Sequence, residues 1–170
     1  LAISYAISFL LRSENKLNIH EFIDEISEFV RTENEEMSER VRNIKNYLNK
    51  NFSVAIKNIG VGSYVLKSVP FAIYGFARSP FNFKETLENM IDAKGDTDSN
   101  AAMACALSGA FNGFSKIPHD LLNKIQDINL GIDTGYGNIG FSVTTKKEEL
   151  LCGILKLDGK TKDRLNEKRM

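Results

Sequence analysis

The residues with the clearest capacity for chemistry lie at 95–100, in the sequence Gly-Asp-Thr-Asp-Ser-Asn. Asp96 and Asp98 supply two carboxylates two positions apart, and Ser99 adds a hydroxyl. In a loop that enters a helix, these three oxygen donors can converge on one point, where a hard cation relieves the repulsion between the carboxylates. Oxygen-only ligands favour Mg²⁺, Mn²⁺ or Ca²⁺ over zinc. The segment is therefore a candidate metal site.

Helix capping is the alternative interpretation of the same residues, and on spacing alone it is the favoured one. Asp, Ser and Asn are preferred N-cap residues, and negative charge suits a helix N-terminus. A calcium-binding EF-hand loop is excluded, because the sixth position would be Ala101 where that loop needs Gly, and the twelfth would be Leu107 where it needs Glu.

Two glycine-rich stretches resemble the glycine motif of nucleotide-binding loops, but the sequence around them does not support that function. Residues 135–140 match G-x-G-x-x-G, but we expect no strand before them and a strand, not a helix, after them, so a turn is the better interpretation. Gly60 and Gly62 lack a third glycine, since Val65 stands in its place. They predict a close backbone approach, either to a neighbouring helix or to a ligand.

The remaining candidate side chains favour structural roles. His20 and His119 fall at the starts of predicted helices, with no Cys or His at metal-binding spacing, and are interpreted as solvated. Cys105 lies in a helix of small residues and is expected to be inert packing, while Cys152 has no nearby Cys or His.

Helical periodicity dominates the elements that would position the acidic motif. Apolar residues recur at three- and four-residue steps, which predicts amphipathic helices. We expect helices near 1–11, 19–30, 37–48, 60–76 with a kink near Pro70, 82–91, 96–113 and after Pro118, and a short strand at 141–145. The helix after the motif is rich in Ala, Ser and Gly, so it should be central, with neighbours on several sides.

The composition is that of a globular protein. Of 170 residues, 42% are hydrophobic and 26% charged, which excludes a disordered chain. Lys plus Arg and Asp plus Glu each total 22, and this balance argues against a nucleic-acid partner. Two cysteines predict a reducing, cytoplasmic location. The apolar start at 1–11 is too short to span a membrane, and we interpret the chain as a piece of a longer one.

Together, these residues resemble a known family. Residues 95–102, then 106–113 and Ile117-Pro118, are similar to the signature G-G-D-T-D-[ST]-N-A, G-A-x-x-G, I-P near the C-terminal end of ADP-ribosylglycohydrolases. Residues 61–63 and 68–74 resemble the preceding helix of that family. The likeness is good over about 55–125, looser before it, and absent after Asp127. It shifts the balance from capping to a metal site.

The resemblance implies an all-α fold, an orthogonal multi-helix bundle with a short irregular or β-hairpin-like C-terminal segment. Residues 1–130 would form the C-terminal part of the helical domain, and 131–170 a glycine-rich, charged tail. Asp96, Asp98 and Ser99 would be ligands in a centre of two Mg²⁺ ions. The implied activity is release of ADP-ribose from a modified protein side chain or an ADP-ribose-like small molecule, with no membrane partner.

The chain also departs from the family pattern. Lys94 replaces the first glycine of the G-G pair, and nothing before Asp96 resembles the family's Thr-Asp-Asp-type motif. The catalytic residue is therefore unassigned, and an N-terminal segment is an implied partner. Three hypotheses follow: an ADP-ribosyl hydrolase, a non-catalytic relative that binds or builds structure, and a helical interaction module whose acidic loop only caps a helix.

Overall fold

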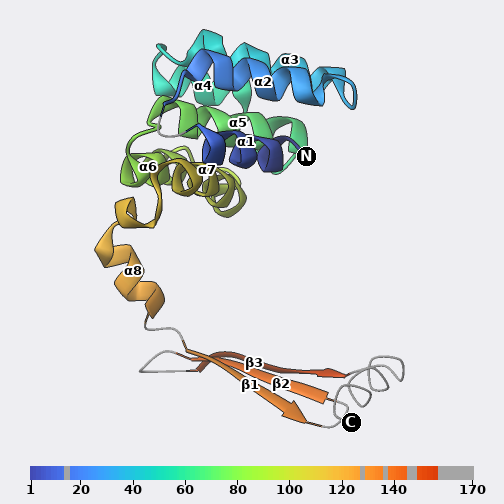
Figure 1. Ribbon diagram of the computed structural model, residues 1–170, viewed down its shortest axis with the longest axis vertical. Coiled ribbons are helices and arrows are strands. Elements are labelled where there is room, and N and C mark those ends of the chain that lie inside the picture. The colour runs from blue at the N-terminus through green and yellow to red at the C-terminus, as the bar shows by residue number, and fades with distance from the viewer. Residues whose placement is uncertain (14–15, 127–128, 136–137, 145–148, 157–170) are drawn as a thin grey trace. The chain divides into compact units, whose positions relative to one another are not determined.

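A computed structural model describes residues 1–13, 16–126, 129–135, 138–144 and 149–156 of the chain. The chain divides into two compact units, Leu1–Pro118 and His119–Met170 (Figure 1). The described part of the first unit is helical, which confirms the all-α fold. Its elements are α1 (Ala2–Arg12), α2 (Ile19–Arg31), α3 (Glu35–Asn43), η1 (Ile44–Tyr47), α4 (Phe52–Ile59), α5 (Val65–Arg78), α6 (Phe83–Asp92), α7 (Thr97–Asn112) and η2 (Phe114–Lys116).

The helices of the first unit stack in three layers (Figure 1). Helices α2, α3 and α4 form one layer, α1 and α5 the next, and α6 and α7 the third. Helix α5 is the most deeply buried of these, with a buried residue at every position from Pro70 to Ala77. Aromatic rings join the layers: the Phe76 ring lies edge-on to those of Phe22 of α2 and Phe111 of α7.

Four helices of this unit begin with an asparagine cap. The side chains of Asn18, Asn34, Asn51 and Asn82 each accept a hydrogen bond from an N–H of the following first turn. Such caps satisfy N–H groups that the helix itself leaves without partners, and each typically contributes about 1 kcal/mol. The boundaries of α2, α3, α4 and α6 are thus set locally by sequence.

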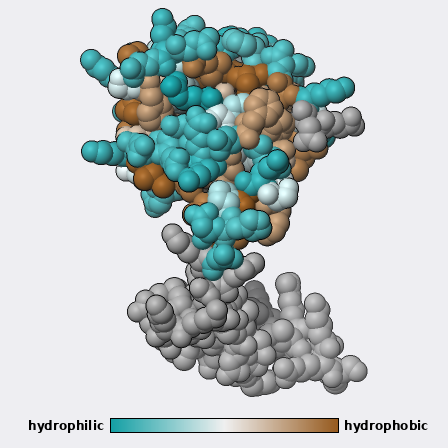
Figure 2. All heavy atoms as spheres, turned by 90° about the vertical axis from the view of Figure 1, so that its left-hand side faces the viewer, coloured by the Kyte–Doolittle hydropathy of each residue, from teal (hydrophilic) through white to brown (hydrophobic). Residues whose placement is uncertain are grey.

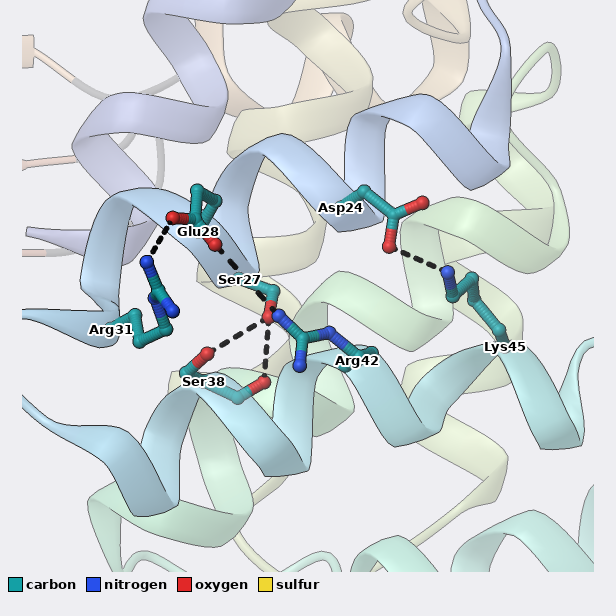
Figure 3. A network of polar contacts seen from close by, with 7 residues as sticks. All are labelled: Asp24, Ser27, Glu28, Arg31, Ser38, Arg42 and Lys45. Carbon is teal, nitrogen blue, oxygen red and sulfur yellow. Dashed lines mark hydrogen bonds and ion pairs between the residues drawn. The ribbon is translucent and has the colours of Figure 1, made fainter.

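Helices α2 and α3 are held together by polar contacts as well as apolar ones (Figure 3). The buried Ser27 hydroxyl lies 2.9 Å from both the carbonyl oxygen and the hydroxyl of Ser38. At the surface, Lys45 pairs with Asp24, and Glu28 pairs with Arg31 and Arg42. Each of these groups therefore has a partner within the pair of helices and the adjoining η1.

Helix α7 is central, as its small residues predicted. It packs against α1, α5 and α6, and buries Asn100, Ala104, Leu107, Ser108 and Phe111. At its far end the Asn112 amide donates to the carbonyl oxygens of Pro80 and Ser108, at 2.7 and 2.9 Å. The contact with Pro80 ties the C-terminal end of α7 to the segment between α5 and α6.

The second unit comprises α8 (His119–Gln126) and a three-stranded antiparallel sheet of β1 (Asn129–Gly135), β2 (Asn138–Thr144) and β3 (Glu149–Lys156), in that order. Residue Ile132 pairs with Phe141, and Phe141 with Gly153. The β-hairpin-like segment is thus confirmed. The expectation that no strand precedes the glycines at 135–140 was wrong, because β1 ends at Gly135. The predicted domain extents, 1–130 and 131–170, stay predictions.

The face of the helical unit in Figure 2 mixes hydrophilic and hydrophobic residues. Through the described ranges, we find no helix with the length and apolar character needed to cross a bilayer. The prediction of a cytoplasmic location is not tested by this finding.

Candidate metal site

Two residues with positive φ lie in the connection between α6 and α7. Lys94 has φ 62° and Gly95 has φ 77°. A Cβ atom on Gly95 would overlap the carbonyl oxygen of Val61, so this position requires glycine on both conformational and steric grounds. Lys94 adopts the left-handed conformation that costs a residue with a side chain roughly 1–2 kcal/mol. The position at which the family signature has its first glycine is therefore one that favours glycine here too.

The carbonyl oxygen of Val61 is the anchor of this loop. It accepts hydrogen bonds from the backbone N–H of Asp96, at 2.9 Å, and from the side-chain amide of Asn100, at 3.1 Å. A close backbone approach does occur at this turn, but Gly95 makes it, against the Val61 carbonyl group. A Cβ atom on Gly62 would meet no described atom within 4 Å, so the approach predicted for the two glycines was wrong at Gly62. The turn between α4 and α5 supports the start of α7.

The two carboxylates of the motif lie together. A hydrogen bond with the Asp96 carboxyl lowers the pKa of Asp98, and the backbone N–H groups of Ser99 and Asp98 lower it further. Asp96 is half-buried, whereas Asp98 and Ser99 are exposed. The loop therefore gathers negative charge at an accessible point of the surface.

Capping explains only part of this arrangement. Asp96 occupies the N-cap position of α7, yet among the described residues its carboxylate accepts no capping hydrogen bond. The four asparagine caps of the same unit each accept a hydrogen bond from an N–H of the first turn, and the Asp96 side chain accepts none. The Asp96 carboxylate thus keeps acceptor capacity for a ligand.

The donor set fits a hard divalent cation. Two carboxylates and a hydroxyl are oxygen ligands of the kind that Mg²⁺ takes, and Mg²⁺ commonly binds through one or two carboxylates while keeping several waters. Asn100 follows these residues in the sequence, and its Oδ1 atom is buried with no hydrogen-bond partner in the described part of the chain. Across the described residues, no group of three or more His, Cys, Asp or Glu side chains is placed to share an ion. An ion here would need ligands beyond this loop.

The other candidates occupy structural positions. His20 and His119 are exposed at the starts of α2 and α8, in agreement with their interpretation as solvated. Burial raises the pKa of the Cys105 thiol to about 11, so this thiol is neutral and a poor nucleophile at physiological pH.

Comparison with known proteins decides the family. The model of the ADP-ribosylglycohydrolase family matches residues 1–148. The chain belongs to the ADP-ribosylglycohydrolase family. The match includes the described segments before Asn51, where the resemblance in sequence was looser.

Individual relatives of this family member cover shorter stretches. The ADP-ribosylhydrolase ARH3 of Xenopus tropicalis is 38% identical over 73 residues, which span 37% of this chain and 21% of the relative. ARH3 of Homo sapiens is 38% identical over 73 residues, spanning 37% and 20%. An uncharacterised protein of Archaeoglobus fulgidus is 29% identical over 107 residues, spanning 63% and 34%. The chain thus covers about a fifth to a third of these relatives.

Sequence reasoning missed two residues that shape this family member's site. Asn100 was grouped with capping residues, whereas its side chain is fully buried and bonds Val61. Val61 is the second residue, and its side-chain type carries no signal for a role played by its carbonyl group. The assignment of Asp96, Asp98 and Ser99 as metal ligands stays a proposal.

Proposed function

We propose that this chain carries part of the site of a Mg²⁺-dependent hydrolase, which removes ADP-ribose from a modified protein side chain or a small acceptor. Membership of the ADP-ribosylglycohydrolase family supports the reaction class. The observation that carries the proposal is the pair of accessible carboxylates at the start of α7, where the Asp96 carboxyl group lowers the pKa of Asp98 and Asp96 makes no capping hydrogen bond.

In this proposal Asp96, Asp98 and Ser99 hold the cation, within a complete site of two Mg²⁺ ions. When bound, divalent ions supply a template that orients ribose hydroxyls and a water near the anomeric carbon. The chain's own contribution is to keep two carboxylates fixed on the end of a buried helix. Negative charge placed there also favours the oxocarbenium-like transition state of glycosidic bond cleavage. The general acid is not assigned to a residue of this chain.

A non-catalytic family member is the second candidate. It is favoured by the small donor set at this loop, since the described residues offer it two carboxylates and no third acidic, His or Cys side chain. Lys94, directly before the loop, adds a positive charge that opposes cation binding. Such a protein would bind ADP-ribose-like molecules or serve a structural role without hydrolysis.

Release of free ADP-ribose distinguishes the two candidates. The protein is incubated with ADP-ribosylated peptides linked through Arg or Ser, with Mg²⁺ or with EDTA. The hydrolase proposal predicts Mg²⁺-dependent release that Asp98→Asn abolishes, while Asp92→Asn, an exposed position at the end of α6, leaves it intact. Binding of ADP-ribose without release under any of these conditions would support the non-catalytic candidate.

A further inference from the structure

We propose that Asn100 is a positioning residue for the metal loop: through the Val61 carbonyl it holds the α4–α5 turn against the start of α7 and so sets the placement of Asp96 and Asp98. The inference rests on the proposed metal site and names a residue that controls it. Asn100 is outside the predicted ligand set, and its side chain is buried rather than directed to the surface.

The contact that carries this role joins segments far apart in the sequence. The Asn100 amide nitrogen donates to the Val61 carbonyl oxygen at 3.1 Å, across 39 positions of the chain. The same oxygen accepts the Asp96 N–H at 2.9 Å. One carbonyl group therefore ties down both ends of the acidic segment, with Asp98 and Ser99 between the two tethers.

The amide orientation is fixed by chemistry. A carbonyl oxygen only accepts hydrogen bonds, so the side-chain nitrogen of Asn100, and not its oxygen, must face Val61. The oxygen then points elsewhere, and it is buried with no partner among the described residues. A buried acceptor without a partner costs about 1–3 kcal/mol. The free-energy cost of the unpaired oxygen thus offsets much of the stabilisation from the hydrogen bond that the side-chain nitrogen makes.

Because these two contributions largely cancel, Asn100 adds little to the stability of the fold. Its role is better explained by the position that it imposes on the acidic loop. An apolar side chain of similar size would bury no unpaired oxygen, and Val61 would keep the hydrogen bond from Asp96. Asn100→Leu should therefore fold. In this variant the α4–α5 turn would keep its hydrogen bond from the Asp96 N–H and lose the one from residue 100. The acidic segment would then sample more positions, which weakens binding of an ion that needs Asp96 and Asp98 together.

The test measures stability and ion affinity separately. Asn100→Leu, Asn100→Ala and the matched control Asn112→Ala are each titrated with MgCl₂ by calorimetry, well below their melting temperatures. Asn112 also lies on α7 and also donates its amide to a distant carbonyl, that of Pro80, but at the helix end remote from the acidic loop. Melting temperatures are recorded in EDTA.

We expect Asn100→Leu to melt near the wild type and yet bind Mg²⁺ about 10- to 100-fold more weakly, the range typical of residues that orient metal ligands. Asn100→Ala should bind equally weakly, and Asn112→Ala should bind as the wild type does even if it melts earlier. A wild-type affinity in either folded Asn100 variant would overturn the positioning role while leaving the metal site in place. A wild type that binds no Mg²⁺ would overturn the metal site itself, and this inference with it.

Discussion

The α2–α3 pair and the start of α7 are both rich in polar side chains, but they use them differently. Between α2 and α3 the groups satisfy one another: Ser27 bonds Ser38, and Lys45 pairs with Asp24 at 2.5 Å (Figure 3). At the start of α7, neither Asp96 nor Asp98 forms an ion pair within the described ranges.

The difference indicates which polar cluster is structural. Groups that serve only to hold helices together gain by pairing, because an unpaired buried group costs free energy. Acceptors left without partners at an accessible loop are what a ligand site requires. The two clusters therefore predict opposite responses: mutations between α2 and α3 should change stability alone, and mutations at the start of α7 should change ion binding.

The largest expected effect is that of Gly95→Ala. The new methyl group would meet the Val61 carbonyl oxygen, and alanine would be held at φ 77°. We expect a loss of about 2–4 kcal/mol in the free energy of unfolding, from left-handed strain plus the steric overlap. Urea denaturation measures it.

Gly113→Ala is the matched control for Gly95→Ala. Gly113 has the same φ of 77°, but a Cβ atom there would have no described atom within 4 Å. It should cost only the backbone strain at φ 77° and ψ 168°, about 1–3 kcal/mol. Equal losses for the two variants would show that the contact between Gly95 and Val61 does not constrain the loop.

Next in size is Ser27→Ala, which removes the buried hydroxyl shared with Ser38. We expect the free energy of unfolding to fall by about 1–2 kcal/mol, the usual cost of losing a buried hydrogen bond. Affinity for Mg²⁺ should not change. Ser4→Ala, at an exposed position on α1, controls for helix propensity. Weaker Mg²⁺ binding by Ser27→Ala would contradict the distinction between structural polar groups at the α2–α3 interface and ligand groups at the start of α7.

Lys94→Gly should be stabilising. Glycine adopts the φ of 62° found here without a side-chain penalty, so we expect a gain of about 1 kcal/mol, reduced by the greater freedom of glycine in the unfolded chain. Removal of the positive charge should also tighten Mg²⁺ binding slightly. Lys84→Gly, within α6, should instead destabilise. Destabilisation by Lys94→Gly would contradict the proposed strain.

The smallest expected effect on stability at neutral pH is that of Cys105. It is studied in a Cys152→Ser background, so that Cys105 is the thiol that is alkylated. Because its pKa is raised to about 11, iodoacetamide should alkylate it at pH 8 roughly a hundredfold more slowly than in the unfolded chain. Above pH 9 the unfolded thiol ionises first, so stability should fall as pH rises towards 11. Rapid alkylation of the folded protein would show that α7 is not packed as described.

The sequence predicted most of the helices and a candidate site at the start of α7, because both depend on local pattern. It missed α4, which lies between the helices expected at 37–48 and 60–76. Apolar spacing marked α2 and α3, and the abundance of Ala and Ser marked α7 as a helix approached closely by others. The strand β1 was missed, since Asn129–Gly135 contains two glycines and an aspartate, which disfavour strands locally. The anchor at Val61 could not be predicted, because its carbonyl acts through a contact that only the folded chain creates.

Whether Asp96 and Asp98 bind a cation is tested most directly by Mg²⁺ titration of thermal unfolding. Wild type and Asp92→Asn should each gain about 2.7 kcal/mol at a concentration of 100 Kd. Asp96→Asn and Asp98→Asn, which keep the side-chain shape and remove the charge, should gain little at that concentration. No gain for the wild type, or an equal gain for all four proteins, would contradict a metal site at the start of α7.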